Sequence, residues 1–181
     1  MGYKRSSLRA DYHAKVARVT VENWVDHDLQ AMVDLAREVI GVPLASITVL
    51  DGDTFHFLVS AGSDPFCADY DDAMCKYSME EPGVFSVPDT LADERMVGLP
   101  YVDGRAGSMR FYASAPVYAR DHAMVGRFCL FDTQPRELEP EHEWLLAKLG
   151  HSAGKAIQRA VQARPEGVPL LDADRATQHT G

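Results

Sequence analysis

A β-hairpin in the first third of the chain constrains the fold most. In residues 45–50, Ala-Ser-Ile-Thr-Val-Leu, apolar and polar side chains alternate up to Val49, and several are β-branched. After Asp51-Gly52-Asp53, the segment Thr54–Ser60 continues with the same period of two. An Asp-Gly pair between two such runs is typical of a tight hairpin turn. We therefore expect an antiparallel sheet at the centre of the fold.

Hydrophobic periodicity predicts the remaining elements. Apolar residues that recur every three or four positions predict helices. Alternating apolar and polar residues, or short runs of β-branched residues, predict strands. Helices are expected over residues 8–18, 29–40, 93–97 and about 140–161, and further strands over residues 84–87, 109–117 and 124–131. Asp26 or Asp28 is expected to cap the second helix, and Asp93 the third. Residues 63–83 are expected to form a long loop with short helical pieces. This order of elements predicts an α+β fold with an antiparallel sheet.

The length of 181 residues suits one domain of ordinary size. We expect a helical extension over residues 1–25 and the domain itself over residues 26–163. Residues 164–181 contain few apolar side chains, and we expect this tail to be disordered.

Charge and cysteine usage exclude several classes of protein. The 27 acidic and 18 basic side chains give a net charge of −9, which disfavours nucleic acid and anionic membranes as partners. The stretch Val39–Leu50 is the longest without a charged residue and is too short for a membrane span of about 20 residues. No secretory signal is recognisable, and the three cysteines form no CxxC pair. We expect a cytoplasmic protein with reduced thiols and no metal site.

Four spaced motifs carry a family resemblance. They are Met74-Cys75, Val87-Pro-Asp-Thr-Leu-Ala-Asp-Glu-Arg95, Arg110-Phe-Tyr-Ala-Ser-Ala-Pro116 and Gly126-Arg-Phe-Cys-Leu-Phe-Asp132. With these residues the chain resembles a GAF domain, a sensory module of bacterial signalling proteins, over about residues 26–162. The resemblance implies a GAF/PAS-like antiparallel sheet of five to six strands. Terminal helices would lie on one face, and loops with short helices on the other.

The chain departs from the family pattern at several functional positions. Lys76 follows Cys75, so the Cys-His pair of chromophore-binding relatives is absent. The cysteine set of the GAF-fold methionine sulfoxide reductases is not recognisable, and no motif supplies a nucleophile, a base and an orienting acid. We therefore expect a stand-alone sensory or regulatory domain that is not an enzyme. The sequence leaves its cofactor unknown.

The resemblance places a ligand pocket between the sheet and the loops of residues 63–83 and 89–108. The candidate ligand-binding residues come from these segments and the neighbouring strands. They are Cys75, Phe85, Asp89, Arg95, Arg110, Tyr112 and Cys129. A structural interpretation stays open for several of them. Arg95 would then pair with Asp89 to pin the loop, and Arg110 and Tyr112 would face solvent as an ordinary surface pair.

Two rival functions remain. In the resembling fold the segment with Cys75 lies over the strand with Cys129, so the two thiols are expected to approach each other. They would then act as a redox sensor or a small reductase. Alternatively, both cysteines are buried apolar side chains, and the domain is a ligand-free interaction scaffold.

Two glycines in the last helix, Gly150 and Gly154, indicate a close approach to another element, because glycine costs about 1 kcal/mol inside a helix. We expect a second helix there, in a homodimer formed through the terminal helices. Packing against the chain's own sheet is the alternative. A signalling partner protein would read the ligand-dependent change at this helical surface.

Overall fold

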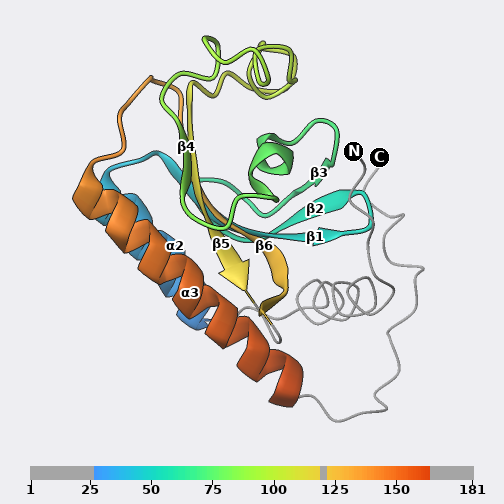
Figure 1. Ribbon diagram of the computed structural model, residues 1–181, viewed down its shortest axis with the longest axis vertical. Coiled ribbons are helices and arrows are strands. Elements are labelled where there is room, and N and C mark those ends of the chain that lie inside the picture. Colours follow the sequence, from blue (N-terminus) through green and yellow to red (C-terminus); the bar gives the residue numbers. More distant parts are fainter. Residues whose placement is uncertain (1–26, 119–121, 164–181) are drawn as a thin grey trace.

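The computed structural model describes residues 27–118 and 122–163, which form one antiparallel sheet covered on both faces (Figure 1). The helices are α2 (His27–Ile40), η1 (Met74–Ser78, a 3-10 helix) and α3 (Pro140–Ala163). The strands are β1 (Leu44–Asp51), β2 (Thr54–Ala61), β3 (Cys67–Asp69), β4 (Phe85–Val87), β5 (Phe111–Tyr118) and β6 (Met124–Asp132). Their order across the sheet is β3-β2-β1-β6-β5-β4. The predicted α+β class is confirmed, and so is the antiparallel sheet, which has six strands where five to six were predicted.

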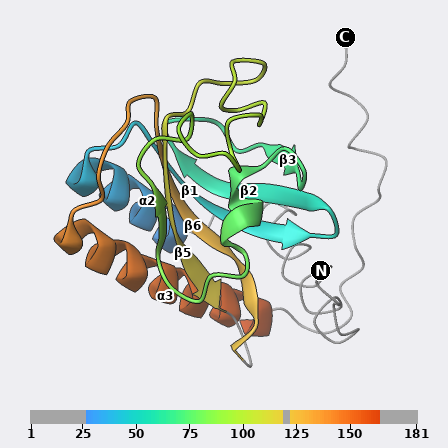
Figure 2. The ribbon, with the colours of Figure 1, turned by 45° about the horizontal axis from the view of Figure 1, so that its top comes forward.

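The two sides of the sheet carry different layers. Helices α2 and α3 lie side by side on one face, and η1 with its flanking loops lies on the other (Figures 1 and 2). No helix within the described residues is long and apolar enough to cross a membrane.

Strand alternation separates two cores. Along β1, Ile47 and Val49 point to the helices, while Leu44 and Leu50 belong to a second apolar cluster under the loops. Strand β5 follows the predicted division: Phe111, Ala113, Ala115 and Val117 pack against the helices, and Tyr112 lies under the loops. The sheet therefore has one face that builds the main core and one that is available for a site.

The structure corrects two parts of the sequence-based prediction, and two further parts lie outside the described residues. The short edge strand β3 was missed, because its three residues provide no readable alternation. The helix predicted over residues 93–97 is wrong. This segment forms hydrogen-bonded turns, in which Met96 and Val97 both donate to the carbonyl of Asp93 and the Asp93 carboxylate accepts the backbone N–H of Arg95. The helical extension of residues 1–25 and the tail of residues 164–181 lie outside the described part of the chain.

The glycines of α3 contact the chain's own sheet, not a second helix. A methyl group added at Gly154 would lie 2.1 Å from the carbonyl oxygen of Tyr118, and one at Gly150 would lie 2.8 Å from that of Pro116. Both oxygens belong to β5, so the glycines allow α3 to pack closely against this strand. The predicted role of these glycines in bringing a second helix close is therefore wrong.

Gly154→Ala is expected to destabilise the protein, although alanine favours an ordinary helix by about 1 kcal/mol. The added methyl group cannot fit against the rigid backbone of β5, so we expect a loss of about 1–3 kcal/mol in the free energy of unfolding, measured in urea. Ser152→Ala, at an exposed position of the same helix, is the control and should be neutral or slightly stabilising. A Gly154→Ala protein that is as stable as the control would contradict the packing.

Candidate functional site

A small apolar pocket lies between the loop face of the sheet and the segments that cross it. Its volume is about 30 Å³. The sheet, the segment of residues 66–75 and the segment of residues 101–109 all contribute to its wall. The lining residues are Leu44, Phe57, Phe66, Ala68, Ala73, Met74, Cys75, Tyr101, Met109 and Phe131. The pocket therefore lies where the resemblance placed it.

Aromatic contacts hold the pocket wall together. The rings of Phe57 and Phe66 stack with their centroids 4.0 Å apart, and Tyr101 approaches Phe66 at 6.1 Å. Phe57 also lies 6.2 Å from Phe131 on β6. Contacts of this kind link the sheet with both loop segments.

Two thiols meet at the pocket. Cys75 lines it from η1, and its Sγ lies 3.6 Å from Sγ of Cys129 on β6. Both side chains are buried, with exposed fractions of 1% and 0%. The Cys129 sulfur also lies 3.7 Å from the hydroxyl oxygens of Thr48 and of Tyr112. The predicted approach of the two cysteines is confirmed.

The hydrogen bonds around η1 fix the position of Cys75. The Ser78 hydroxyl donates to the carbonyl of Cys75 at 2.9 Å and also lies 2.9 Å from the Tyr112 hydroxyl. Ser78 and Tyr112 are both fully buried. Tyr112 thus connects β5 with the 3-10 helix that carries the thiol.

The two thiols have opposite shifts of pKa. A hydrogen bond from Cys129 lowers the pKa of Cys75, and further hydrogen bonds and the positive charge of Arg127 act in the same direction against the effect of burial. Burial raises the pKa of Cys129 well above its ordinary value, so Cys129 holds its proton more strongly than Cys75 does. Burial likewise raises the pKa of Tyr112. Of the two thiols, Cys75 is therefore the one that ionises more easily.

Arg127 is a fully buried cation that sequence reasoning did not single out. Its guanidinium donates to the carbonyls of Glu81 and Gly83 at 2.8 and 3.0 Å, and to the carbonyl and hydroxyl of Ser114 at 3.0 and 3.1 Å. It thereby fixes the chain between η1 and β4 on the sheet. A single arginine within the apolar run of β6 was the available signal.

The polar residues of the predicted site form two separate pairs. Arg110 donates two hydrogen bonds to Asp89, at 2.8 and 2.6 Å, and this contact lowers the pKa of the Asp89 carboxyl. Arg95 pairs with Asp93 at 2.9 Å. The proposed pairing of Arg95 with Asp89 is wrong, because the turn at residues 93–97 brings Arg95 back onto its near neighbour.

The structure distributes the seven candidate ligand-binding residues over three places. Cys75 lines the pocket, and Cys129 and Tyr112 lie directly behind it. Phe85 packs against Tyr112, with ring centroids 6.1 Å apart, and the guanidinium of Arg95 lies 5.2 Å from the Phe85 ring. Asp89 and Arg110 connect the loop start to β5.

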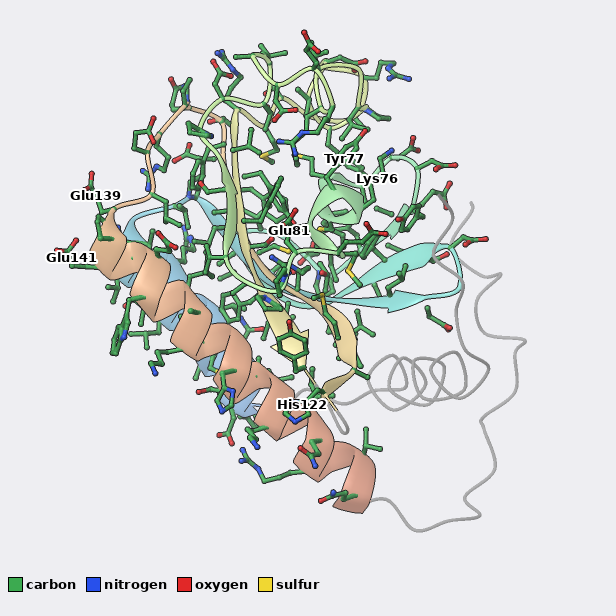
Figure 3. All side chains as sticks on the ribbon, viewed as in Figure 1. Lys76, Tyr77, Glu81, His122, Glu139 and Glu141 are labelled. Atoms are coloured by element: carbon green, nitrogen blue, oxygen red, sulfur yellow. The ribbon has the colours of Figure 1, made fainter. Side chains whose placement is uncertain are left out.

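Burial contradicts one alternative for Arg110 and Tyr112. Tyr112 is completely buried beneath η1, and Arg110 binds Asp89, so the two do not form a solvent-facing pair. Lys76 and Tyr77 of η1 lie on the loop side of the sheet, opposite α3, and Glu81 lies between η1 and β4 (Figure 3).

Within residues 27–118 and 122–163, no three His, Cys, Asp or Glu side chains gather in a group that would hold a metal ion.

Comparison with known proteins identifies the class to which this protein belongs. The sequence pattern of the GAF domain family matches residues 25–157. The chain belongs to the GAF domain family. Its fold is that of the GAF domain of an Acinetobacter phosphoenolpyruvate-protein phosphotransferase, with a TM-score of 0.61 and 17% identity over 86% of this chain and 96% of that one.

Two further proteins are similar. The cyclic di-GMP phosphodiesterase PA2567 of Pseudomonas aeruginosa is 32% identical over 153 residues, which are 82% of this chain. The chain spans 26% of the length of that relative. A free methionine-R-sulfoxide reductase from Neisseria meningitidis has a TM-score of 0.60 and 14% identity, over 90% of this chain and 96% of that one.

These findings correct the expectation that the chain is not an enzyme. The 32%-identical relative is named for a phosphodiesterase activity. The Neisseria protein, which shares the fold, is named as a reductase. The missing motifs on which the expectation rested do not exclude catalysis, because a site in this fold need not use a short sequence signature.

Arg127→Met should destabilise the protein by roughly 3 kcal/mol, measured by urea unfolding. The substitution leaves the buried carbonyl of Ser114 without its donor, and a buried unpaired group costs about 1–3 kcal/mol. It also removes the part-buried hydrogen bonds to the carbonyls of Glu81 and Gly83. Faster hydrogen exchange over residues 79–84 should accompany the loss.

The control is Arg159→Met, which removes an exposed arginine 4.0 Å from Asp28 and should cost less than about 1 kcal/mol. Equal stability of the two variants would contradict the anchoring role of Arg127.

Proposed function

We propose that this GAF domain is a sensory or regulatory domain that binds a small ligand in the pocket between the sheet and the loops of residues 63–83 and 89–108. One observation carries the proposal. The pocket wall combines side chains from the sheet with Met74 and Cys75 from the first loop and Tyr101 from the second. Ligand occupancy would therefore change how both loops pack on the sheet.

The lining indicates the chemistry of the ligand. Every side chain in the pocket wall is apolar, aromatic or sulfur-containing, and the lining includes no Asp, Glu, His, Lys or Arg. An uncharged molecule suits this lining, because an ion would lose its hydration without gaining a partner. The volume of about 30 Å³ accepts only a very small molecule unless the loops move apart.

The irregular structure of the second loop, residues 89–108, is compatible with movement on ligand binding. Residues 88–110 contain no helix or strand and extend beyond the sheet (Figure 1). Exposed pairs such as Arg105 with Asp103 and Arg95 with Asp93 contribute to holding it. Such exposed ion pairs contribute little stability each. Met96, Leu99 and Val102 are buried and anchor the loop in the apolar cluster, so adaptation to a ligand would involve the exposed parts of the loop around these anchors.

The similarity to the phosphodiesterase of Pseudomonas aeruginosa supports a regulatory role. This chain matches 26% of that protein. We propose that the domain controls the activity of a catalytic partner, either another segment of the same polypeptide or a separate protein. The change would be read at the helical face, since α3 packs directly on β5 and also contacts α2.

The outer surface of the helices supports dimerisation as the route of signalling. Leu35 and Val39 on α2 and Trp144 on α3 are apolar and 46%, 52% and 64% exposed. Two copies that bury these side chains would couple their helices. Equilibrium sedimentation is expected to give twice the 20.0 kDa mass of the chain, and Trp144→Glu should shift the equilibrium towards the monomer. A wild-type monomer at high concentration would contradict this part of the proposal.

Ala73→Phe should abolish ligand binding by filling the pocket with a ring. The measurement is mass spectrometry of the freshly purified protein, first native and then denaturing. A non-covalent adduct is expected only in the native spectrum of the wild type, and it should be absent from Ala73→Phe.

Ala92→Phe adds the same ring at an exposed position and should keep the adduct. A wild-type protein without any adduct would contradict ligand binding and would favour the scaffold alternative. An adduct that survives in Ala73→Phe would place the ligand elsewhere.

A further inference from the structure

We propose that Cys75 and Cys129 form a redox site for small hydroperoxides, in which Cys75 attacks the peroxide and Cys129 closes a disulfide. The inference deepens the proposed function, because it rests on the same pocket and names a class of molecule that reacts there. It does not require a ligand that stays bound.

Geometry selects this pair among the three cysteines. The two sulfur atoms are 3.6 Å apart, and a disulfide bond of about 2.05 Å needs only a short further approach. Cys75 belongs to η1, a single short 3-10 helix outside the sheet, whereas Cys129 is held within the centre of the sheet by the strands on both sides. The movement therefore falls on η1.

The pocket provides the way in. Cys75 is one of its lining residues, although only 1% of the side chain is exposed, and Cys129 lies behind Cys75 with no exposed surface. A peroxide that enters the pocket therefore meets Cys75 first. A volume of about 30 Å³ accepts hydrogen peroxide, which is only slightly larger than water, and excludes a bulky aromatic hydroperoxide.

The pKa shifts of the two thiols favour these roles. Hydrogen bonding by Cys129 lowers the pKa of Cys75, and thiolates are the reactive form. Burial raises the pKa of Cys129, so this thiol stays protonated until it reacts. The hydroxyl groups of Thr48 and Tyr112 lie close enough to the pair to stabilise negative charge on sulfur.

The chemical steps balance. The Cys75 thiolate attacks one peroxide oxygen, the O–O bond breaks, and the products are Cys75 sulfenic acid and an alkoxide or hydroxide that takes up a proton. Cys129 then attacks the Cys75 sulfur, the S–O bond breaks and water leaves with the Cys129 proton. The two thiols have lost two electrons, and the peroxide has gained them. An external dithiol returns both cysteines to the reduced form.

The disulfide has a structural consequence. The Cys75 carbonyl accepts from Ser78, whose oxygen is 2.9 Å from that of Tyr112, so a displaced Cys75 disturbs this chain of contacts. Met74 and Cys75 also belong to the pocket wall, so oxidation changes its shape. Oxidation would therefore alter the same pocket that binds the ligand.

Cys67 is the internal control. It is exposed on the edge strand β3, its Sγ lies 3.2 Å from Nδ1 of His56, and burial of part of the side chain raises its pKa. The contact with His56 is the one neighbour that could assist ionisation, but burial outweighs it and the pKa of Cys67 is raised while that of Cys75 is lowered. Hydrogen peroxide should therefore oxidise Cys67 more slowly than Cys75 despite its exposure.

The test uses the full chain, reduced and then treated with hydrogen peroxide at graded pH. Remaining thiols are alkylated under denaturing conditions, and the mass and peptide map are recorded. We expect loss of two alkylatable thiols and a cross-linked peptide pair containing Cys75 and Cys129. Cys67→Ser should not change this result. In Cys129→Ala the reaction should stop at Cys75 sulfenic acid, trapped by dimedone, and Cys75→Ala should show neither product.

Further arms distinguish this inference from ligand binding. Ala73→Phe should slow oxidation of Cys75 severalfold while Ala92→Phe does not, and cumene hydroperoxide should react far more slowly than hydrogen peroxide. The rate should reach its plateau at a lower pH than the rate of Cys67 alkylation. Disulfide formation in a protein without a native adduct would leave this inference intact and overturn ligand binding.

Three results would overturn the redox site. They are oxidation of Cys67 before Cys75, a Cys75 sulfenic acid that persists although Cys129 is present, and thiols of the pair that survive a peroxide concentration sufficient to oxidise Cys67. A native adduct found together with any of these results would leave the proposed function standing alone.

Discussion

The buried guanidinium of Arg127 is the constraint on which the site depends. A cation without exposed surface is stable only if its donors are satisfied, and here the carbonyls of Glu81, Gly83 and Ser114 satisfy them. Two of these carbonyls belong to the segment after η1, so satisfying the arginine also fixes that segment on the sheet. The position of Cys75 over β6, and with it the pocket wall, follows from this attachment.

The sheet divides structural and functional roles between its faces. Its helix side forms a continuous apolar core with α2 and α3, in which Gly150 and Gly154 permit close packing. Its loop side carries the pocket, the thiol pair and the buried polar groups Thr48 and Tyr112. Because neighbouring residues on a strand point to opposite faces, the same strands supply both. A change in the pocket can therefore reach the helices through a single layer, the sheet.

The sequence predicts most of the fold, because hydrophobic period identifies α2, α3 and the longer strands. The resemblance predicted the approach of Cys75 to Cys129. It could not identify the contact of Phe66 with Tyr101, which depends on the path of two irregular loops. The same reason explains the wrong partner for Arg95. The hydrophobic pattern of the sequence also did not show that Arg127 is buried. Its acceptors are backbone carbonyls, which every residue has and which a sequence therefore cannot identify.

The central claim is that the two loops close a pocket over the sheet and place Cys75 in its wall. A crystal structure of the reduced full chain at high resolution, grown without added ligand, tests it most directly. The account predicts electron density for a small molecule among Phe57, Met74 and Tyr101, with the Cys75 and Cys129 sulfur atoms in contact behind it. A pocket filled by the protein's own side chains, with the two sulfur atoms apart, would contradict the account.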